Sequence, residues 1–219
     1  MRVFVSYKET GLAEQELSKW IWEIRSVLDY LEYDSFVFWY DMKGKTFDPQ
    51  EVIEIMQQQI KSSDLVLSFV NYAERSEGEL LELGMAYAMG KPVVNFINEE
   101  VESWYRLIDV IGEKILFNGF DDFREKLFQY FGLYLPRERI DQIDEQLLKR
   151  LSERFKWVYR IWKFKKLKWE QLFQPQRWEQ VLSSRVALAQ KFWLSEEFIK
   201  KVWDLIHQEA ISREKLFKK

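Results

Sequence analysis

Apolar residues in the first 131 positions of the chain alternate between short runs and longer amphipathic stretches. The short runs are rich in Val, Ile, Leu and Phe and predict strands at residues 3–5, 36–39, 65–70, 93–96 and 115–117. Between them, apolar residues recur every three or four positions and predict helices at 12–31, 49–62, 79–89, 103–111 and 121–131. Strands that alternate with helices form a mostly parallel sheet covered on both faces. We therefore expect a five-stranded α/β domain over residues 1–132.

The pattern changes after Phe131. Residues 132–136 combine a helix stop at Gly132 with a proline restart at Pro136, and no strand-like run follows. The rest of the chain predicts three helices, at 137–167, 175–192 and 195–217. The first would be roughly 45 Å long at 1.5 Å per residue, too long to bury its apolar stripe against its own chain. We therefore expect an all-α three-helix domain over residues 133–219 that forms an intertwined homodimer through its long helix.

The two predicted domains carry opposite charge. The whole chain has 33 basic and 36 acidic residues, but the segment from Arg137 to the end has 20 basic against 12 acidic residues. A basic helical half is typical either of nucleic-acid binding or of a small anion held by a few cations. The basic residues fall on several helix faces and no nucleic-acid-binding motif is present. This distribution favours a small anionic ligand over nucleic acid.

Composition excludes several kinds of chemistry. The chain has no cysteine and a single histidine, His207, which excludes disulfides, thiolate nucleophiles and multi-histidine metal sites. No run approaches 18 consecutive apolar residues, and the first residues lead directly into a strand pattern without the features of a signal peptide. We expect a cytoplasmic protein that binds no membrane, no metal ion and no cofactor.

Two basic residues lie on or beside the apolar stripe of the long helix. Arg154 and Lys165 are eleven residues apart, which places them within about 20° of one another around the helix axis. A charge on a core-facing stripe is costly unless an anion pairs with it, although both side chains could also reach solvent or glutamates. Arg137 lies roughly 25 Å before Arg154 along the axis, so it can reach the same site only from a second, antiparallel chain.

The segment from Arg137 to about Leu216 resembles the all-helical class of chorismate mutases. The resemblance rests on the runs 137–148, 151–154 and 174–177 and on Lys165. It implies an interlocked dimer in which each site takes one arginine from the partner. It also implies the rearrangement of chorismate to prephenate, a step of aromatic amino acid biosynthesis in the shikimate pathway that needs no cofactor.

The same resemblance assigns roles to individual residues. Arg154 and the partner's Arg137 would bind the two substrate carboxylates, and Arg177 would lie in the wall of the site. Lys165 would donate to the ether oxygen, and Glu214 would face that oxygen from the third helix. A glutamate helps there only when it is protonated, so the activity is expected to fall as the pH rises.

Three positions depart from the family pattern. Gln174 and Trp178 stand where many members have an aspartate and the glutamate that holds the substrate hydroxyl, and Ala210 stands where serine is common. Trp178 therefore becomes a candidate substrate-binding residue of a different kind. Lyases that cleave isochorismate also lack the hydroxyl-binding glutamate while keeping the cations, so isochorismate is an alternative substrate. A non-catalytic, ligand-binding or regulatory protein is the second alternative.

Polar residues gather after the third predicted strand of the α/β domain. Ser76 and Glu79 are spaced as a capping box, and Gly90 as a helix stop. Neither pattern accounts for Glu82, which lies between Leu81 and Leu83 in the second turn of the predicted helix. In open parallel sheets ligands bind at the carboxyl ends of the strands. We therefore expect this segment to face a ligand.

The run from Ser76 to Pro92 resembles the nucleoside 2-deoxyribosyltransferase family and its relatives that hydrolyse deoxynucleoside monophosphates. The resemblance implies a flavodoxin-like fold in which Glu82 attacks the anomeric carbon and Ser76 and Gly78 bind the substrate, with Ser76 beside the 5′-phosphate. Two features depart from the family: residues 54–59 contain no aspartate, and residues 6–9 replace a glycine-containing turn. That opening also resembles the start of a TIR-type domain, which can cleave a glycosidic bond of NAD. We expect a nucleoside or nucleotide ligand here, whether it is converted or only bound.

Overall fold

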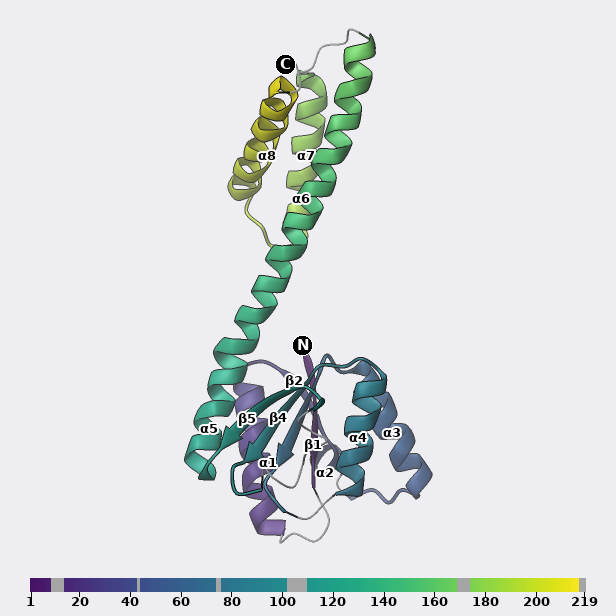
Figure 1. Ribbon diagram of the computed structural model, residues 1–219, viewed down its shortest axis with the longest axis vertical. Coiled ribbons are helices and arrows are strands. Elements are labelled where there is room, and N and C mark those ends of the chain that lie inside the picture. The colour runs from purple at the N-terminus through teal and green to yellow at the C-terminus, as the bar shows by residue number, and fades with distance from the viewer. Residues whose placement is uncertain (9–13, 43, 74–75, 102–109, 169–173, 217–219) are drawn as a thin grey trace. The chain divides into compact units, whose positions relative to one another are not determined.

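The computed structural model describes residues 1–8, 14–42, 44–73, 76–101, 110–168 and 174–216. Contacts divide the chain into two compact units, Met1–Arg139 and Ile140–Lys219. The first unit, the α/β unit, contains all the strands in the described residues, and the second, the helical unit, contains only helices there (Figure 1). Both fold classes agree with the sequence prediction.

Five parallel strands form the sheet of the α/β unit. They are β1 (Arg2–Tyr7), β2 (Asp34–Val37), β3 (Leu65–Val70), β4 (Val93–Asn98) and β5 (Glu113–Phe117). Their order in the sheet is β2-β1-β3-β4-β5, and every pair is parallel. This is the flavodoxin-like order, in which the chain reverses direction across the sheet between β1 and β3.

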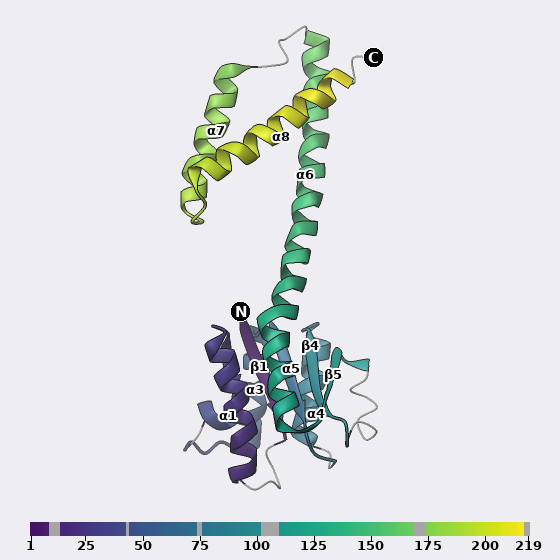
Figure 2. The ribbon, with the colours of Figure 1, turned by 90° about the vertical axis from the view of Figure 1, so that its left-hand side faces the viewer.

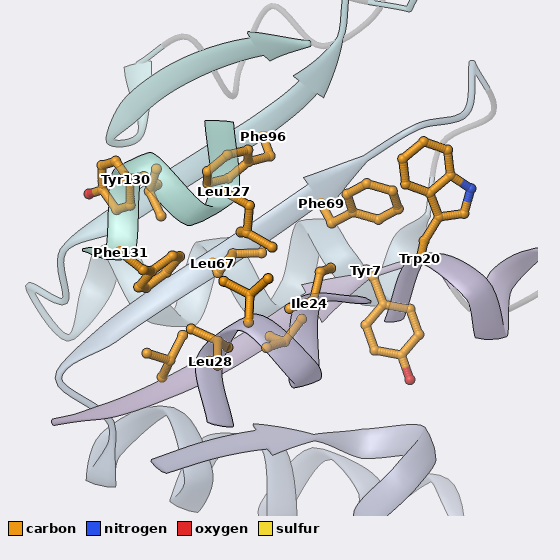
Figure 3. Packing of buried hydrophobic residues seen from close by; sticks show 14 of the residues in the cluster. Tyr7, Trp20, Ile24, Leu28, Leu67, Phe69, Phe96, Leu127, Tyr130 and Phe131 are labelled. Carbon is orange, nitrogen blue, oxygen red and sulfur yellow. The ribbon is translucent and has the colours of Figure 1, made fainter. Parts of the chain in front are cut away.

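Helices cover both faces of the sheet and enclose two apolar layers. The helices are α1 (Glu14–Tyr30), α3 (Pro49–Ser62), α4 (Glu77–Ala88) and α5 (Gly119–Gln129). One layer lies between the sheet and helices α1 and α5, and contains Leu67, Phe69 and Trp20 (Figure 3). The other lies between the sheet and helices α3 and α4, and contains Phe4 and Val66. Alternate residues of one strand therefore serve different layers.

The predicted strand at 36–39 is wrong in its second half. β2 ends at Val37, and Phe38–Asp41 forms the short helix α2. The carboxylate of Asp41 accepts a 2.7 Å hydrogen bond from the backbone N–H of Val37 and pairs with Arg25 at 2.9 Å. These contacts favour a helical turn over continued strand, despite the aromatic residues. Residues 103–109 of the predicted helix at 103–111 lie outside the described residues.

The predicted break at residues 132–136 is also wrong. The chain passes from α5 through a π-helical turn, η3 (Tyr130–Tyr134), directly into α6 (Leu135–Lys168). The backbone N–H of Leu135 donates to the carbonyl of Tyr130, five residues earlier. Tyr130, Phe131 and Leu135 are buried in the layer beneath α5, so packing holds the helical path. Pro136 is the second residue of α6, where its missing N–H does not interrupt the helix.

In the described residues beyond η3 the chain is helical (Figure 2). The helices there are α6, α7 (Pro175–Gln190) and α8 (Glu196–Leu216), which agrees with the predicted number and order. Large apolar side chains of α6 remain exposed, among them Ile143 at 63% and Leu147 at 56%. In the described part of the chain, no helix is long and apolar enough to cross a membrane.

Candidate functional site

A cavity of about 320 Å³ lies among α6, α7 and α8 of the helical unit. Valine, isoleucine and alanine side chains form its apolar lining. Its polar lining consists of Arg154, Lys165, Gln174, Arg177, Trp178 and His207. None of the described lining residues is acidic. The cavity therefore suits an anion that also carries apolar surface.

Helix periodicity brings these side chains together. Arg154 and Lys165 are about three turns apart on α6, so both point to the same side of that helix. α7 begins with Pro175, whose ring is compatible with the first position of a helix, and this places Arg177 and Trp178 in the first turn. The structure thus brings together four of the residues that the sequence predicted to act on the substrate.

Arg154 is the charged group of this cavity with the least favourable surroundings. Its Nη1 atom is buried and has no hydrogen-bond partner within the described residues. Burial, together with the nearby charge of Arg185, lowers the pKa of the Arg154 guanidinium below its ordinary value. A partly dehydrated guanidinium is costly unless an anion accepts its hydrogen bonds. A ligand carboxylate could accept two parallel hydrogen bonds from it.

A second group of buried polar side chains lies in the α/β unit, where β1 and β3 run side by side. Ser6 and Ser68 are neighbours in the register of these strands. Ser6 donates a 2.5 Å hydrogen bond to Oε2 of Glu82, and Ser68 donates a 3.2 Å hydrogen bond to Oε1 of Glu79. All four residues are buried. They lie where the strand order reverses, which is the usual ligand position in sheets of this order.

The start of α4 differs from the predicted capping box. The side chain of Ser76 accepts a hydrogen bond from the backbone N–H of Glu79, as a helix cap does. The carboxyl group of Glu79, however, turns inward to Ser68 rather than back to the backbone of Ser76. Gly78 lies between them in the first turn and is exposed. The predicted hydrogen bond to the Ser76 side chain is confirmed, and the predicted return hydrogen bond from the backbone of Ser76 to the Glu79 side chain is wrong.

Glu79 is a buried carboxyl group that sequence reasoning assigned only to capping. Burial raises its pKa to about 8, against the opposing effects of the Ser68 hydrogen bond and the charge of Lys8. Glu79 is therefore largely protonated at neutral pH. The alternation along β1 and β3 could have indicated that Ser6, Lys8 and Ser68 share one face, but not that Glu79 turns towards it. In the described residues no group of three His, Asp or Glu side chains could hold a metal ion.

Comparison with known families bears directly on the cationic cavity. The family model described as chorismate mutase type II matches residues 136–215. The helical unit resembles a chorismate mutase. The match contains every described residue that lines the cavity. No curated protein matches the chain.

Solved structures match the N-terminal part of the chain at low identity. CMP N-glycosidase BcmB from Clostridium botulinum is 22% identical, with 59% of this chain and 99% of that chain covered and a TM-score of 0.47. A conserved protein from Enterococcus faecalis V583 is 15% identical, with 58% and 97% covered and a TM-score of 0.45. The 2-deoxyribosyltransferase from Bacillus psychrosaccharolyticus is 17% identical, with 59% and 92% covered and a TM-score of 0.43.

Two predicted residues of the chorismate mutase-like unit are not among the described residues that line the cavity. Arg137 is exposed in the first turn of α6 and lies outside the described lining. Glu214 belongs to α8, but its side chain is outside the described residues. Gln174, Trp178 and Ala210, which depart from the family pattern, all line the cavity. The departures therefore fall within the site itself rather than on a remote surface.

His207 is a lining residue of the chorismate mutase-like cavity that sequence reasoning missed. Its ring stacks on that of Trp178, with ring centroids 4.1 Å apart and an angle of 13° between the planes. Helix spacing offered a signal, because His207 precedes Ala210 by three residues and Ile211 by four. All three side chains line the cavity.

Proposed function

We propose that the helical unit catalyses the rearrangement of chorismate to prephenate. The observation that carries this proposal is one cavity that collects Arg154, Lys165 and Arg177 inside the segment matched by the chorismate mutase type II family. Chorismate has two carboxylates and a largely apolar ring. Three cations set in an apolar lining fit that combination of charge and shape.

The proposed roles follow from the demands of the reaction. One C–O bond breaks and one C–C bond forms within the substrate, and no proton or electron is exchanged. The site must hold the chair-like conformer and stabilise the negative charge that develops on the ether oxygen. Arg154 binds one carboxylate through its guanidinium fork, and Arg177 adds positive charge to the wall. Lys165 donates to the ether oxygen, and Glu214 in protonated form would donate to it as well.

A second copy of the chain completes the site by supplying the partner's Arg137 for the other carboxylate. The exposed apolar stripe of α6 supports such a dimer, since Ile140, Ile143 and Leu147 are each more than half exposed. Apolar side chains in a row on an uncovered helix are typical of an interface with a partner.

Charge along α6 supports an antiparallel arrangement of the two copies. Between Glu138 and Glu145 the helix has four acidic residues and one basic residue. From Arg154 to Lys168 it has seven basic residues and none that is acidic. Antiparallel pairing would place the acidic segment of each helix beside the basic segment of the other. Such complementarity favours this register over a parallel one.

Isochorismate is the alternative substrate, and the presence of Trp178 in the cavity favours this alternative. With Trp178 in place of the glutamate that holds the chorismate hydroxyl, the site resembles lyases that release salicylate and pyruvate. A regulatory protein that binds either dianion without turnover is the second alternative.

The deciding experiment separates these outcomes by product. The purified protein is incubated with chorismate and, separately, isochorismate, and products are identified by chromatography. We expect prephenate from chorismate, with the rate lowered on the order of a hundredfold in Arg154→Ala. Arg150→Ala serves as the matched control, because Arg150 is exposed and pairs with Glu153. Salicylate would favour the lyase, and stabilisation by a ligand without product would favour the regulatory protein.

For the α/β unit we propose a nucleoside or nucleotide ligand and, with it, N-glycosidase or deoxyribosyltransferase chemistry at Glu82. The supporting observation is that Glu82 is buried and accepts a hydrogen bond from the hydroxyl of Ser6. The two residues lie where the strand order of the sheet reverses. In the proposed reaction the Glu82 carboxylate attacks the anomeric carbon and the N-glycosidic bond breaks. The base leaves and takes a proton from water, and water or a second base then attacks the sugar and releases it from Glu82.

This second activity is tested with nucleosides and nucleoside 5′-monophosphates, in the presence and absence of a second free base. Release of base by the wild type and its loss in Glu82→Gln would support the glycosidase. Exposed Glu77→Gln is the matched control. Binding without base release would show that the unit is a sensor rather than an enzyme.

A further inference from the structure

The stacked rings of Trp178 and His207 form an aromatic wall of the cationic cavity. Trp178 belongs to the first turn of α7 and His207 to the middle of α8, so the contact joins two helices across the site. The centroid separation of 4.1 Å and the angle of 13° between the planes hold the imidazole flat against the indole. His207 and Trp178 both line the cavity together with Arg154.

The surroundings of His207 favour its neutral form. Burial lowers the pKa of the imidazole, Asp204 on the same helix opposes this effect, and Arg154 on α6 adds to it. The other charged residues of the described lining are Lys165 on α6 and Arg177 on α7, both cationic. A neutral imidazole offers one donor nitrogen and one acceptor nitrogen.

Few other lining groups could accept a hydrogen bond from a ligand hydroxyl. The lysine and the two arginines only donate hydrogen bonds, and so does the indole of Trp178. Gln174 can both donate and accept, but it is exposed at the start of α7. His207 is the half-buried lining residue, within the described part of the cavity, that has both a donor and an acceptor.

We propose that His207, oriented by Trp178, binds the ring hydroxyl of the dianionic substrate and sets the specificity of the site for hydroxylated rings. Trp178 occupies the position of the missing glutamate, and the imidazole stacked on it takes over the contact with the hydroxyl. One ring nitrogen is enough for this contact. The inference rests on the proposed chorismate mutase function, which supplies a substrate with two carboxylates and one ring hydroxyl.

The test compares two ligands in three variants. The ligands are chorismate and an analogue with hydrogen in place of the ring hydroxyl, and the variants are His207→Phe, His207→Gln and exposed Gln208→Ala as the control. His207→Phe keeps an aromatic ring against Trp178 but removes the hydrogen bond. His207→Gln keeps a donor and an acceptor. Titration calorimetry measures binding of both ligands, and product formation gives kcat and KM for chorismate.

We expect His207→Phe to weaken chorismate binding about tenfold, mainly in KM, and to change binding of the analogue less than twofold. His207→Gln should recover part of the loss, and Gln208→Ala should behave as the wild type. An equal loss for both ligands, or no loss for either, would overturn the role of His207. If the wild type binds chorismate but does not convert it, only the proposed mutase function is overturned, because the binding comparison still tests the role of His207. Failure to bind chorismate at all would overturn both.

Discussion

The hydroxyl of Ser6 and the carboxylate of Glu82 are joined by a 2.5 Å hydrogen bond between β1 and α4. Both residues are buried, and they are 76 positions apart in the sequence. This bond ties the candidate nucleophile of the α/β unit to the central part of its sheet. A carboxylate held in this way keeps its position without help from a ligand, which is the preorganisation that covalent catalysis requires.

Ser6→Ala is expected to destabilise the α/β unit by about 1–3 kcal/mol, because it leaves a buried acceptor of Glu82 without this donor. Denaturant unfolding measures the change. Ser35→Ala is the matched control, since Ser35 is a buried strand residue whose hydroxyl has no hydrogen-bond partner within the described residues. Equal losses for the two variants would show that the Ser6 hydrogen bond contributes nothing specific.

Glu79 is expected to make the stability of the α/β unit depend on pH. Its carboxyl group has a pKa near 8 in the folded chain, raised from 4.5, so the folded state holds a proton that the unfolded state releases. Stability should therefore fall as the pH rises from about 4.5 to about 8. Glu79→Gln removes this dependence, and its Tm should exceed that of the wild type by an increasing margin towards pH 9.

Thermal unfolding at several pH values measures this margin. Glu77→Gln is the control, because Glu77 is exposed in the same turn of α4. Parallel Tm curves for wild type and Glu79→Gln would contradict a buried, protonated Glu79.

Arg154→Met is expected to separate stability from ligand binding. The substitution removes a partly buried cation whose Nη1 has no hydrogen-bond partner within the described part of the chain. The Tm of the ligand-free protein should therefore rise by a few degrees. Chorismate should stabilise the wild type but not the variant, because the guanidinium that we propose binds a substrate carboxylate is gone.

Differential scanning fluorimetry with and without chorismate measures both effects of Arg154→Met. Arg150→Met, which removes an exposed arginine paired with Glu153, should change neither. A chorismate-induced shift that survives in Arg154→Met would exclude Arg154 from the binding site.

Leu147→Glu is expected to convert a dimer into monomers. Leu147 is 56% exposed on the apolar stripe of α6, and a buried glutamate at the centre of the interface would lack a partner. Size-exclusion chromatography with light scattering gives the mass of each variant. Gln146→Glu introduces the same charge one position earlier, about 100° around the helix, and should remain a dimer. A monomeric wild type would refute the proposed assembly.

The sequence predicted the sheet more accurately than its surroundings. The strand at Leu65–Val70 has the predicted bounds, because six consecutive buried residues have a polar residue on each side. The error at Phe38 has a different origin, since the carboxylate of Asp41 competes with the strand for the Val37 N–H. The error at Pro136 arises because packing of Phe131 overrides a local helix stop. The helix and strand propensities of individual residues do not reveal either contact.

In the candidate sites, too, the sequence indicated some residues and missed others. The pattern of residues along single helices, which the sequence displays directly, indicated Arg154, Lys165 and Glu82 as candidates. Glu79 and His207 escaped because their significance depends on partners from other elements, Ser68 on β3 and Trp178 on α7. Such contacts depend on strand register and helix packing, which one sequence does not reveal.

The two edges of the sheet are short or charged where they are exposed. β2 has only four residues and begins at exposed Asp34, and β5 begins with exposed Glu113 and Lys114. Unpaired edge strands attract strands of other molecules, and short length and charge oppose this attraction. Two copies held together by their α6 helices would therefore not aggregate through the edge strands of their sheets, and each sheet would remain five-stranded.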